Sequence, residues 1–238
     1  MASAWSSSRL AAVANPKIAD QVLVTPESRV RASEQIIDEL AYAAGMDPIA
    51  FRRANIDPTT TLGSRWISAL DAVTIAAGWK PGVAFSKKQT GDVRKGRGFG
   101  FGTFSSTQVG VIADIEVNVK TGKIVCTHAW ASQNNGITVN MEGVATQMSG
   151  SLIQGLSRVL YEQATWNRDR VTSIDWVTYP ILRFKDSPKV TNVLINKPDQ
   201  LPLGVGETTV CPIPAAVANA FFDATGVRLR SGPFTPAV

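Results

Sequence analysis

Apolar residues fall at helical spacing from Ser33 to Ala44, the first clearly periodic segment of the chain. The apolar positions three or four residues apart are Ile36, Ile37, Leu40, Ala41 and Ala44. Glu34, Asp38 and Glu39 lie on the opposite face of the same helix, which is the pattern of an amphipathic helix at a protein surface. Residues 1–31 show no such period, so we expect an irregular lead-in before this helix.

A short second helix is predicted from Pro48 onward, because Asp47 can cap its first turn and proline suits the first helical position. Its spacing turns Arg52 and Arg53 to solvent. The residues that the same spacing turns inward are Phe51 and Ile56. The segment therefore predicts a small helix that packs through its apolar side.

A third helix is expected from Ser64 to Trp79, followed by a polar, glycine-containing loop from Lys80 to Arg97. We assign residues 1–95 to a helical lead-in subregion. The next stretch, from Gly96 to Gly102, has glycine at every second position. It fails the dinucleotide-binding fingerprint, since the third required glycine is missing and no helix follows. A strand whose glycine face packs closely against another backbone is predicted instead.

Beyond Gln108 the apolar period changes to two, which is typical of half-buried strands. We expect a hairpin first, with strands over 108–119 and 124–131 and a turn at 120–123. A polar loop over 133–140 and a helix over 141–162 follow. The last expected elements are a β-turn-β segment over 166–183, a strand over 189–196, and a helix over 214–224 that ends at Gly226. The predicted fold class is α+β, with mixed sheets and packed helices, and residues 96–238 form its α+β region.

Composition is that of an ordinary globular chain, with 44% hydrophobic and 18% charged residues. The net charge of +5 is spread along the sequence without a basic run, so we expect no nucleic-acid partner. No apolar run is long enough to span a bilayer, and the first residues do not form a signal peptide. We expect a soluble protein that is cytoplasmic, or periplasmic by association with another chain.

Two cysteines and one histidine leave little room for metal chemistry within the chain. Cys126 and Cys211 are far apart, which argues against a disulfide framework, a zinc site or an iron–sulfur cluster. Both are expected to be reduced and packed. His128 lies in a predicted strand, where a hydrogen-bonded structural role is favoured. No metal-ligating residues are assigned.

Glu207 stands out among the acidic residues because of the turn that presents it. It follows Gly204-Val205-Gly206, and prolines and alanines after it predict a helix. Glycines allow positive φ and close approach of another group. One interpretation is a working carboxylate on a tight loop near a helix N-terminus. The other is a solvated surface glutamate, as most loop glutamates are.

The helix predicted over 141–162 contains Gly150 and Gly155, and each glycine costs about 1 kcal/mol relative to alanine in a helix interior. Their presence indicates close packing on that side of the helix. The partner is either the sheet or a ligand lying against the early turns, where Gln147 is placed.

Four stretches, taken in order, resemble the C-terminal part of the molybdopterin-binding large subunit of the xanthine dehydrogenase/aldehyde oxidase family, closest in character to the isoquinoline 1-oxidoreductase type. They are residues 33–52, the Gln147-x-x-Gly150-x-x-x-Gln154-Gly155-Leu156 run, residues 179–183, and Gly204-Val-Gly-Glu207 with Pro212, Pro214, Asn219 and Ala220. Each stretch alone is weak. Their order and spacing make the resemblance specific, and it implies part of a molybdenum-hydroxylase cofactor-binding domain.

The resemblance also implies roles for individual residues. Glu207 takes the place of the family's general base beside molybdenum, in the oxidation of an aldehyde or N-heterocycle with water as the oxygen source. Gln147, Gly150, Gly204 and Gly206 take the places of cofactor-binding positions. Iron–sulfur clusters are expected on a partner subunit.

Departures from the family pattern limit what this chain can do by itself. The family subunit is much longer, and its upstream cofactor loops and pocket residues have no counterpart here. No role is carried over to Arg31, because the family has a longer loop at that position. The chain therefore needs the remainder of the molybdopterin subunit as a partner. The alternative is a non-catalytic, truncated remnant that serves as an interaction or assembly module.

Overall fold

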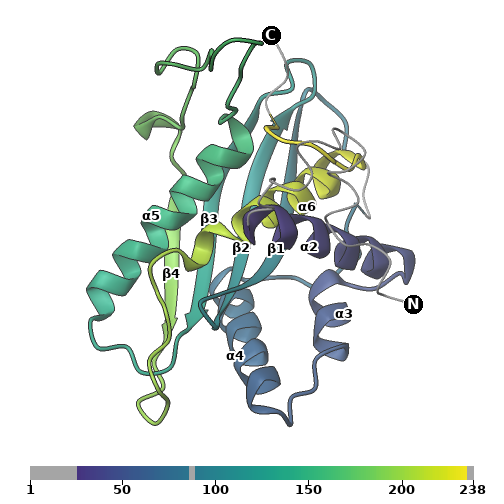
Figure 1. Ribbon diagram of the computed structural model, residues 1–238. Coiled ribbons are helices and arrows are strands. Elements are labelled where there is room, and N and C mark those ends of the chain that lie inside the picture. The colour runs from purple at the N-terminus through teal and green to yellow at the C-terminus, as the bar shows by residue number, and fades with distance from the viewer. Residues whose placement is uncertain (1–25, 86–88, 235–238) are drawn as a thin grey trace.

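The computed structural model describes residues 26–85 and 89–234, which form one mixed four-stranded sheet with helices on both faces (Figure 1). The helices are α2 (Pro26–Ala43), α3 (Pro48–Ala54), α4 (Thr61–Ala76), α5 (Met141–Leu160) and α6 (Ile213–Thr225), with two 3₁₀ turns, η1 (Phe184–Asp186) and η2 (Thr208–Val210). The strands are β1 (Val93–Phe104), β2 (Thr107–Asn118), β3 (Ile124–Asn134) and β4 (Lys189–Ile195). This arrangement confirms the predicted α+β class.

The sheet has the strand order β1-β2-β3-β4, with the first three strands antiparallel and β4 parallel to β3. The predicted pair over 108–131 is therefore a real hairpin. A parallel neighbour needs a crossover connection, and α5 lies in the segment that joins β3 to β4. Apolar residues at alternate positions of β2 pack against α5 and α6, whereas Ile112 packs with α4 on the opposite face. The result is a helix–sheet–helix sandwich.

The glycine-rich strand β1 packs directly on the backbone of α6. A Cβ atom added to Gly96 would lie 1.9 Å from the Ala220 carbonyl oxygen, and one added to Gly98 would lie 2.2 Å from that of Ala216. Real side chains do not come so close, so only glycine allows the helix to sit at this distance. The prediction of a strand with a glycine face against another backbone is confirmed, although the strand begins at Val93, inside the predicted loop over 80–97.

Helix α2 differs from its prediction in two ways. It begins at Pro26, so the irregular lead-in predicted over 1–31 is wrong for its last residues, and residues 1–25 lie outside the described part. Its buried face also carries two of the charged residues that were predicted to lie on the opposite, polar face. Glu34 and Asp38 are 6% and 2% exposed, whereas Ile36 and Leu40 are 50% and 53% exposed.

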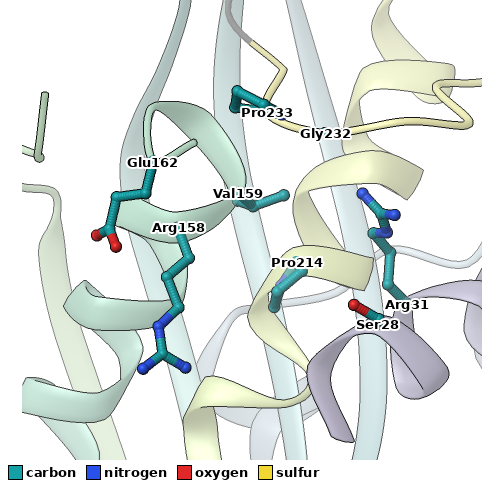
Figure 2. A pocket seen from close by; sticks show the side chains of 8 residues that line it. All are labelled: Ser28, Arg31, Arg158, Val159, Glu162, Pro214, Gly232 and Pro233. Carbon is teal, nitrogen blue, oxygen red and sulfur yellow. The ribbon is translucent and has the colours of Figure 1, made fainter. Parts of the chain in front are cut away.

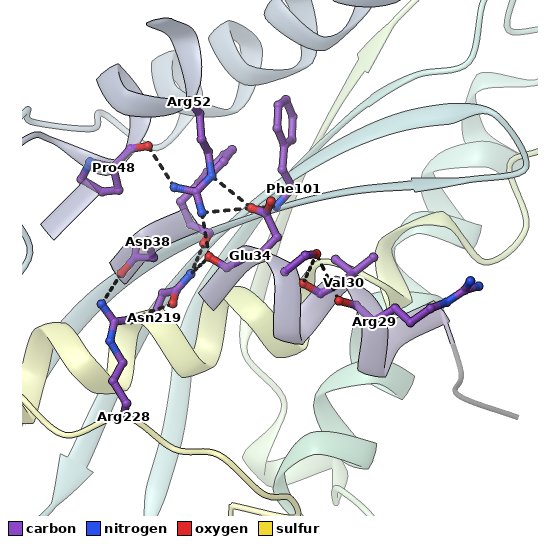
Figure 3. A network of polar contacts seen from close by, with 11 residues as sticks. Arg29, Val30, Glu34, Asp38, Pro48, Arg52, Phe101, Asn219 and Arg228 are labelled. Atoms are coloured by element: carbon purple, nitrogen blue, oxygen red, sulfur yellow. Dashed lines mark hydrogen bonds and ion pairs between the residues drawn. The ribbon is translucent and has the colours of Figure 1, made fainter. Parts of the chain in front are cut away.

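A buried network of charged and polar groups accounts for this reversal (Figure 3). Arg52 of α3, which was predicted to face solvent, is 4% exposed and donates from Nε to the Glu34 carboxylate at 3.0 Å. The same carboxylate accepts the Phe101 backbone N–H at 2.9 Å. Asp38 accepts from Arg228 at 2.8 Å. Counter-charges from distant segments therefore pair the buried carboxylates, which would be costly to bury without them.

The β-turn-β prediction for 166–183 is wrong. Across that segment the structure has a single isolated bridge, Trp166 with Val171, and no strand. A strand needs a neighbouring strand to satisfy its backbone, and the outer position beside β3 is taken by β4. Figure 1 shows the segment after α5 projecting away from the sheet. The division into residues 1–95 and 96–238 stays a prediction, and its boundary falls within β1.

Candidate cofactor-binding site

Glu207 lies at the surface, on the residue that immediately precedes the 3₁₀ turn η2. Its backbone has φ −130° and ψ 27°, and its side chain makes no cap hydrogen bond to the turn. Helix α6 begins shortly afterwards, at Ile213. The side chain is exposed, so the carboxylate is available to a group outside the described residues. A tight loop before a helix is the position that its sequence predicts.

The loop that carries Glu207 is fixed to the sheet at its start. The Thr107 hydroxyl donates to the Gly204 carbonyl oxygen at 2.6 Å, and the Leu203 N–H donates to the Asn135 carbonyl oxygen at 2.9 Å. A Cβ atom on Gly204 would lie 2.4 Å from that of Ser105. Gly204 is therefore a glycine because the turn between β1 and β2 lies against it. Its predicted role in cofactor binding stays a prediction.

The residues just after Glu207 connect the loop to α5, the helix that carries Gln147. The Thr209 hydroxyl donates to the Met148 carbonyl oxygen at 2.6 Å and lies 2.6 Å from the Ser151 hydroxyl oxygen. Ser151 in turn bonds the Gln147 carbonyl oxygen at 2.7 Å. The structure thus brings together two segments that are about 60 residues apart in sequence, and Figure 1 shows the chain passing beside α5 before it enters α6.

The two glycines of α5 have different surroundings. Gly155 faces the turn before α6, where an added Cβ would lie 2.6 Å from Ile213 and 2.8 Å from the Val210 carbonyl oxygen. Gly150 is exposed, and an added Cβ there would meet nothing within 4 Å. Gly206 is equally open. Packing within the fold explains Gly155, whereas Gly150 and Gly206 have open space beside them and lie close in sequence to the exposed Gln147 and Glu207.

A cavity of about 420 Å³ lies elsewhere, between the start of α2, the end of α5 and the start of α6 (Figure 2). Arg31 and Arg158 contribute to its lining, and in Figure 2 their guanidinium groups point away from each other. Burial lowers the pKa of Arg31. Glu207 and Gln147 are not among its lining residues, so this cavity is separate from the predicted site.

The remaining reactive side chains have structural surroundings. Neither cysteine forms a disulfide and both are buried, and burial raises the pKa of Cys126 to about 12, which keeps its thiol protonated. His128 stacks on Trp130 and its Nε2 lies 3.0 Å from the Thr191 hydroxyl, so the predicted structural role is confirmed. Within residues 26–85 and 89–234, no group of three or more His, Cys, Asp or Glu side chains could hold a metal ion.

A family model described as the molybdopterin cofactor-binding domain matches residues 20–188. The chain belongs to this family. Its relatives place it among the molybdopterin-binding subunits of the xanthine dehydrogenase family, which confirms the resemblance seen in the sequence. The matched residues include β1 to β3, α5 and Gln147, and they end before the Glu207 loop.

Several relatives, including the following two, match over most of this chain. A subunit of nicotinate dehydrogenase from Pseudomonas putida is 37% identical over 214 residues, covering 86% of this chain and 18% of its own length. The beta subunit of isoquinoline 1-oxidoreductase from Brevundimonas diminuta is 27% identical over 209 residues, covering 87% of this chain and 25% of its own length. The chain therefore spans about a fifth to a quarter of the relatives it matches.

Among solved structures, the aldehyde oxidoreductase of Desulfovibrio desulfuricans aligns with a TM-score of 0.68 over 89% of this chain and 40% of its own length. At 14% sequence identity, this alignment shows a shared fold alone. The described helices include none that is both long and apolar enough to cross a membrane.

The surface residues fit a polar, hydrogen-bonding group such as molybdopterin. Gln147 offers an exposed amide with donors and an acceptor, and the open faces of Gly150 and Gly206 leave room for close approach. Sequence reasoning missed the residues that fix the Glu207 loop, above all Thr209, which bonds Met148 of α5, and Gln133 of β3, whose side-chain oxygen accepts from Thr208. Nothing in their local sequence distinguishes them, because their partners lie on other elements.

Proposed function

We propose that this chain is the part of a molybdenum-hydroxylase large subunit that presents the general base, Glu207, to substrate. The substrate is an N-heterocycle or an aldehyde, oxidised at an electron-poor carbon. When bound, the molybdenum cofactor supplies the two-electron oxidation chemistry, with water as the source of oxygen. The Glu207 carboxylate would accept the proton of the water-derived hydroxyl that attacks the substrate carbon, and the Gln147 amide would form hydrogen bonds with the pterin.

The observation that carries this proposal is the contact between the Glu207 loop and the Gln147 turn of α5. Thr209 and Met148, joined at 2.6 Å, directly adjoin the segments that bear the two functional side chains. A base and a cofactor ligand must be held in fixed relation for the reaction to proceed. Here they are carried by elements bonded to each other, and both side chains face outward from the fold.

The relatives support a substrate class and a set of partners. The 37% identical relative is named for nicotinate and the 27% identical one for isoquinoline, and both of these compounds are aromatic N-heterocycles. Because the chain spans only part of such subunits, we propose that the remainder of the molybdopterin subunit completes the site. An iron–sulfur subunit then receives the electrons.

The test is reconstitution of the complete enzyme. The chain is co-expressed with the products of its neighbouring reading frames, and the purified complex is assayed for molybdenum and pterin content. Oxidation of nicotinate and of an aromatic aldehyde is then followed with a dye as electron acceptor. Glu207→Gln should lower turnover by about 10²–10⁴-fold while molybdenum content is unchanged.

A matched control is Glu116→Gln. Glu116 pairs with Lys95 on the sheet, and both side chains are substantially exposed. Its replacement should leave turnover within about 2-fold, because an exposed ion pair contributes little. Full activity of Glu207→Gln in a molybdenum-loaded complex would rule out the assignment of the base.

A second function, a non-catalytic interaction module, is favoured by the apolar surface of the segment after α5. Trp176, Val177 and Phe184 are 64%, 86% and 98% exposed. Monomeric proteins seldom leave so many large apolar side chains in water. This function predicts a stable complex with a partner protein in which neither molybdenum nor pterin is bound, which the same purification would reveal.

A further inference from the structure

Two threonines follow Glu207 directly, and each is bonded to a different element of the fold. Both are fully buried, in contrast to the exposed glutamate beside them. The Thr208 hydroxyl donates to the Gln133 side-chain oxygen, near the end of β3. The Thr209 hydroxyl donates to the Met148 carbonyl oxygen, in the second turn of α5. The two residues that directly follow Glu207 are therefore hydrogen-bonded to the sheet, through Thr208, and to helix α5, through Thr209.

The partners of these hydroxyls are themselves fixed. Gln133 is fully buried, and its amide nitrogen lies 3.3 Å from the Asn135 side-chain oxygen. Around Thr209, two hydroxyl protons serve three close oxygen pairs. The three pairs are Thr209 with Met148 at 2.6 Å, Thr209 with Ser151 at 2.6 Å, and Ser151 with Gln147 at 2.7 Å. Loss of the Thr209 hydroxyl removes two of these three contacts, and the Met148 carbonyl oxygen loses its donor on the loop.

The contacts form a short path from the base to the cofactor ligand. It runs from Glu207 along the backbone to Thr209, across to Ser151, and from there to the carbonyl of Gln147. Helix α6 does not depend on these hydroxyls for its position, because the glycine face of β1 already holds it. The hydrogen bonds of Thr208 and Thr209 therefore fix the position of the Glu207 loop rather than the packing of the whole fold.

We propose that Thr208 and Thr209 are positioning residues, which hold the Glu207 carboxylate in register with Gln147 on α5. This inference rests on the proposed function, because a positioning role requires that Glu207 is the base and Gln147 a cofactor ligand. Reacting groups must be placed within a fraction of an ångström, and a misplacement of about 1 Å can cost about 10²-fold in rate. A loop held at two consecutive residues meets that requirement, whereas a freely solvated loop does not.

Thr208→Val and Thr209→Val test the proposal, because valine keeps the branched shape and removes only the hydroxyl. In the reconstituted, molybdenum-containing complex, each should lower kcat by about 10- to 100-fold with little change in KM. The serine variants at both positions restore the hydroxyl and should recover most of the lost kcat. Molybdenum content is measured for every variant.

A second readout does not depend on turnover. Hydrogen–deuterium exchange of the backbone over 203–211 should become faster in both valine variants, while exchange in β1 to β3 stays as in the wild type. Thr74→Val is the matched control, since its hydroxyl donates to the Leu70 carbonyl oxygen at 2.9 Å within α4. That control should leave both kcat and the exchange of 203–211 unchanged.

The outcomes separate the two proposals. Wild-type kcat in both valine variants, or a loss that merely follows a loss of molybdenum, overturns the positioning role. So does unchanged exchange over 203–211. If Glu207→Gln is fully active in the loaded complex, the proposed base fails. If Glu207→Gln is inactive while both valine variants turn over normally, the positioning inference alone fails.

Discussion

Replacement of Arg52 by methionine tests the reversed orientation of α2 most directly. The Arg52 guanidinium is buried, donates to the Glu34 carboxylate at 3.0 Å and to the Pro48 carbonyl oxygen at 2.9 Å, and lies 5.1 Å from the centre of the Phe99 ring. Methionine fills a similar volume but supplies no charge. Glu34 would be left buried with the Phe101 N–H as its remaining donor.

The expected cost is about 3–5 kcal/mol of unfolding free energy at neutral pH, because removal of one partner leaves an uncompensated buried charge. Burial raises the pKa of Glu34, and Arg52 opposes that rise. Loss of Arg52 therefore raises the pKa of the folded carboxyl further. A carboxyl whose folded pKa lies above its unfolded value favours the folded state when protonated, so stability is lost as pH rises from the unfolded pKa to the folded one.

Urea unfolding measures the effect, with Arg53→Met as the control on the same helix. Arg53 pairs with Asp71 at the surface, where the two side chains are 47% and 40% exposed, so its loss should cost less than about 1 kcal/mol. The Arg52→Met deficit should be smaller near about pH 5 than near about pH 8, as the carboxyl becomes protonated. Equal costs for the two variants, or a deficit independent of pH, would contradict the buried network.

Two further predictions concern packing and thiol reactivity. In urea unfolding, Gly98→Ala should destabilise the fold by about 1–3 kcal/mol or more, because its Cβ would lie 2.2 Å from the Ala216 carbonyl oxygen. Gly82→Ala is the control and should be nearly neutral, because a Cβ at Gly82 would lie in open space. An effect of Gly98→Ala no larger than that of Gly82→Ala would refute the close packing. Cys126, with its pKa raised to about 12, should resist iodoacetamide in the folded chain at about pH 8 and react once the chain is unfolded, as mass spectrometry would show. Rapid alkylation in the folded state would contradict this assignment.

Elements defined by local pattern could be predicted from the sequence, and elements defined by distant partners could not. Alternating glycines in β1 and alternating apolar residues in β2 are properties of short windows, and both strands were predicted. The burial of Glu34 depends on Arg52, 18 residues away, and that of Asp38 depends on Arg228, 190 residues away. The apolar spacing of α2 taken alone therefore places Ile36 and Leu40 inward, which is wrong, whereas Ala41 on the same predicted face is buried.

In the candidate site, too, features marked by the local sequence could be predicted, and contacts between distant segments could not. Glycines and prolines mark the turn that carries Glu207, but the roles predicted for Glu207 and Gln147 come from the family resemblance and stay predictions. Their relation to each other depends on Thr209, whose hydrogen bonds cross from the loop to α5. Thr208 and Thr209 resemble any polar pair at a helix start, so their role is visible only in three dimensions.

In the proposed positioning role, buried polar groups fix the placement of exposed ones. Gln133, Thr208, Thr209 and Ser151 are all buried side chains at or near the contact between β3, η2 and α5, and none of them faces outward. A core of this size could hold the same elements with apolar side chains, and isosteric apolar replacement of paired polar groups can be nearly neutral for stability. Apolar side chains could not supply a directional hydrogen bond, such as the one from Thr209 to Met148, that fixes the loop at one position along α5. Under the proposed function, the Glu207 carboxylate needs that restriction, because a base must be held at a fixed position relative to the reacting atoms.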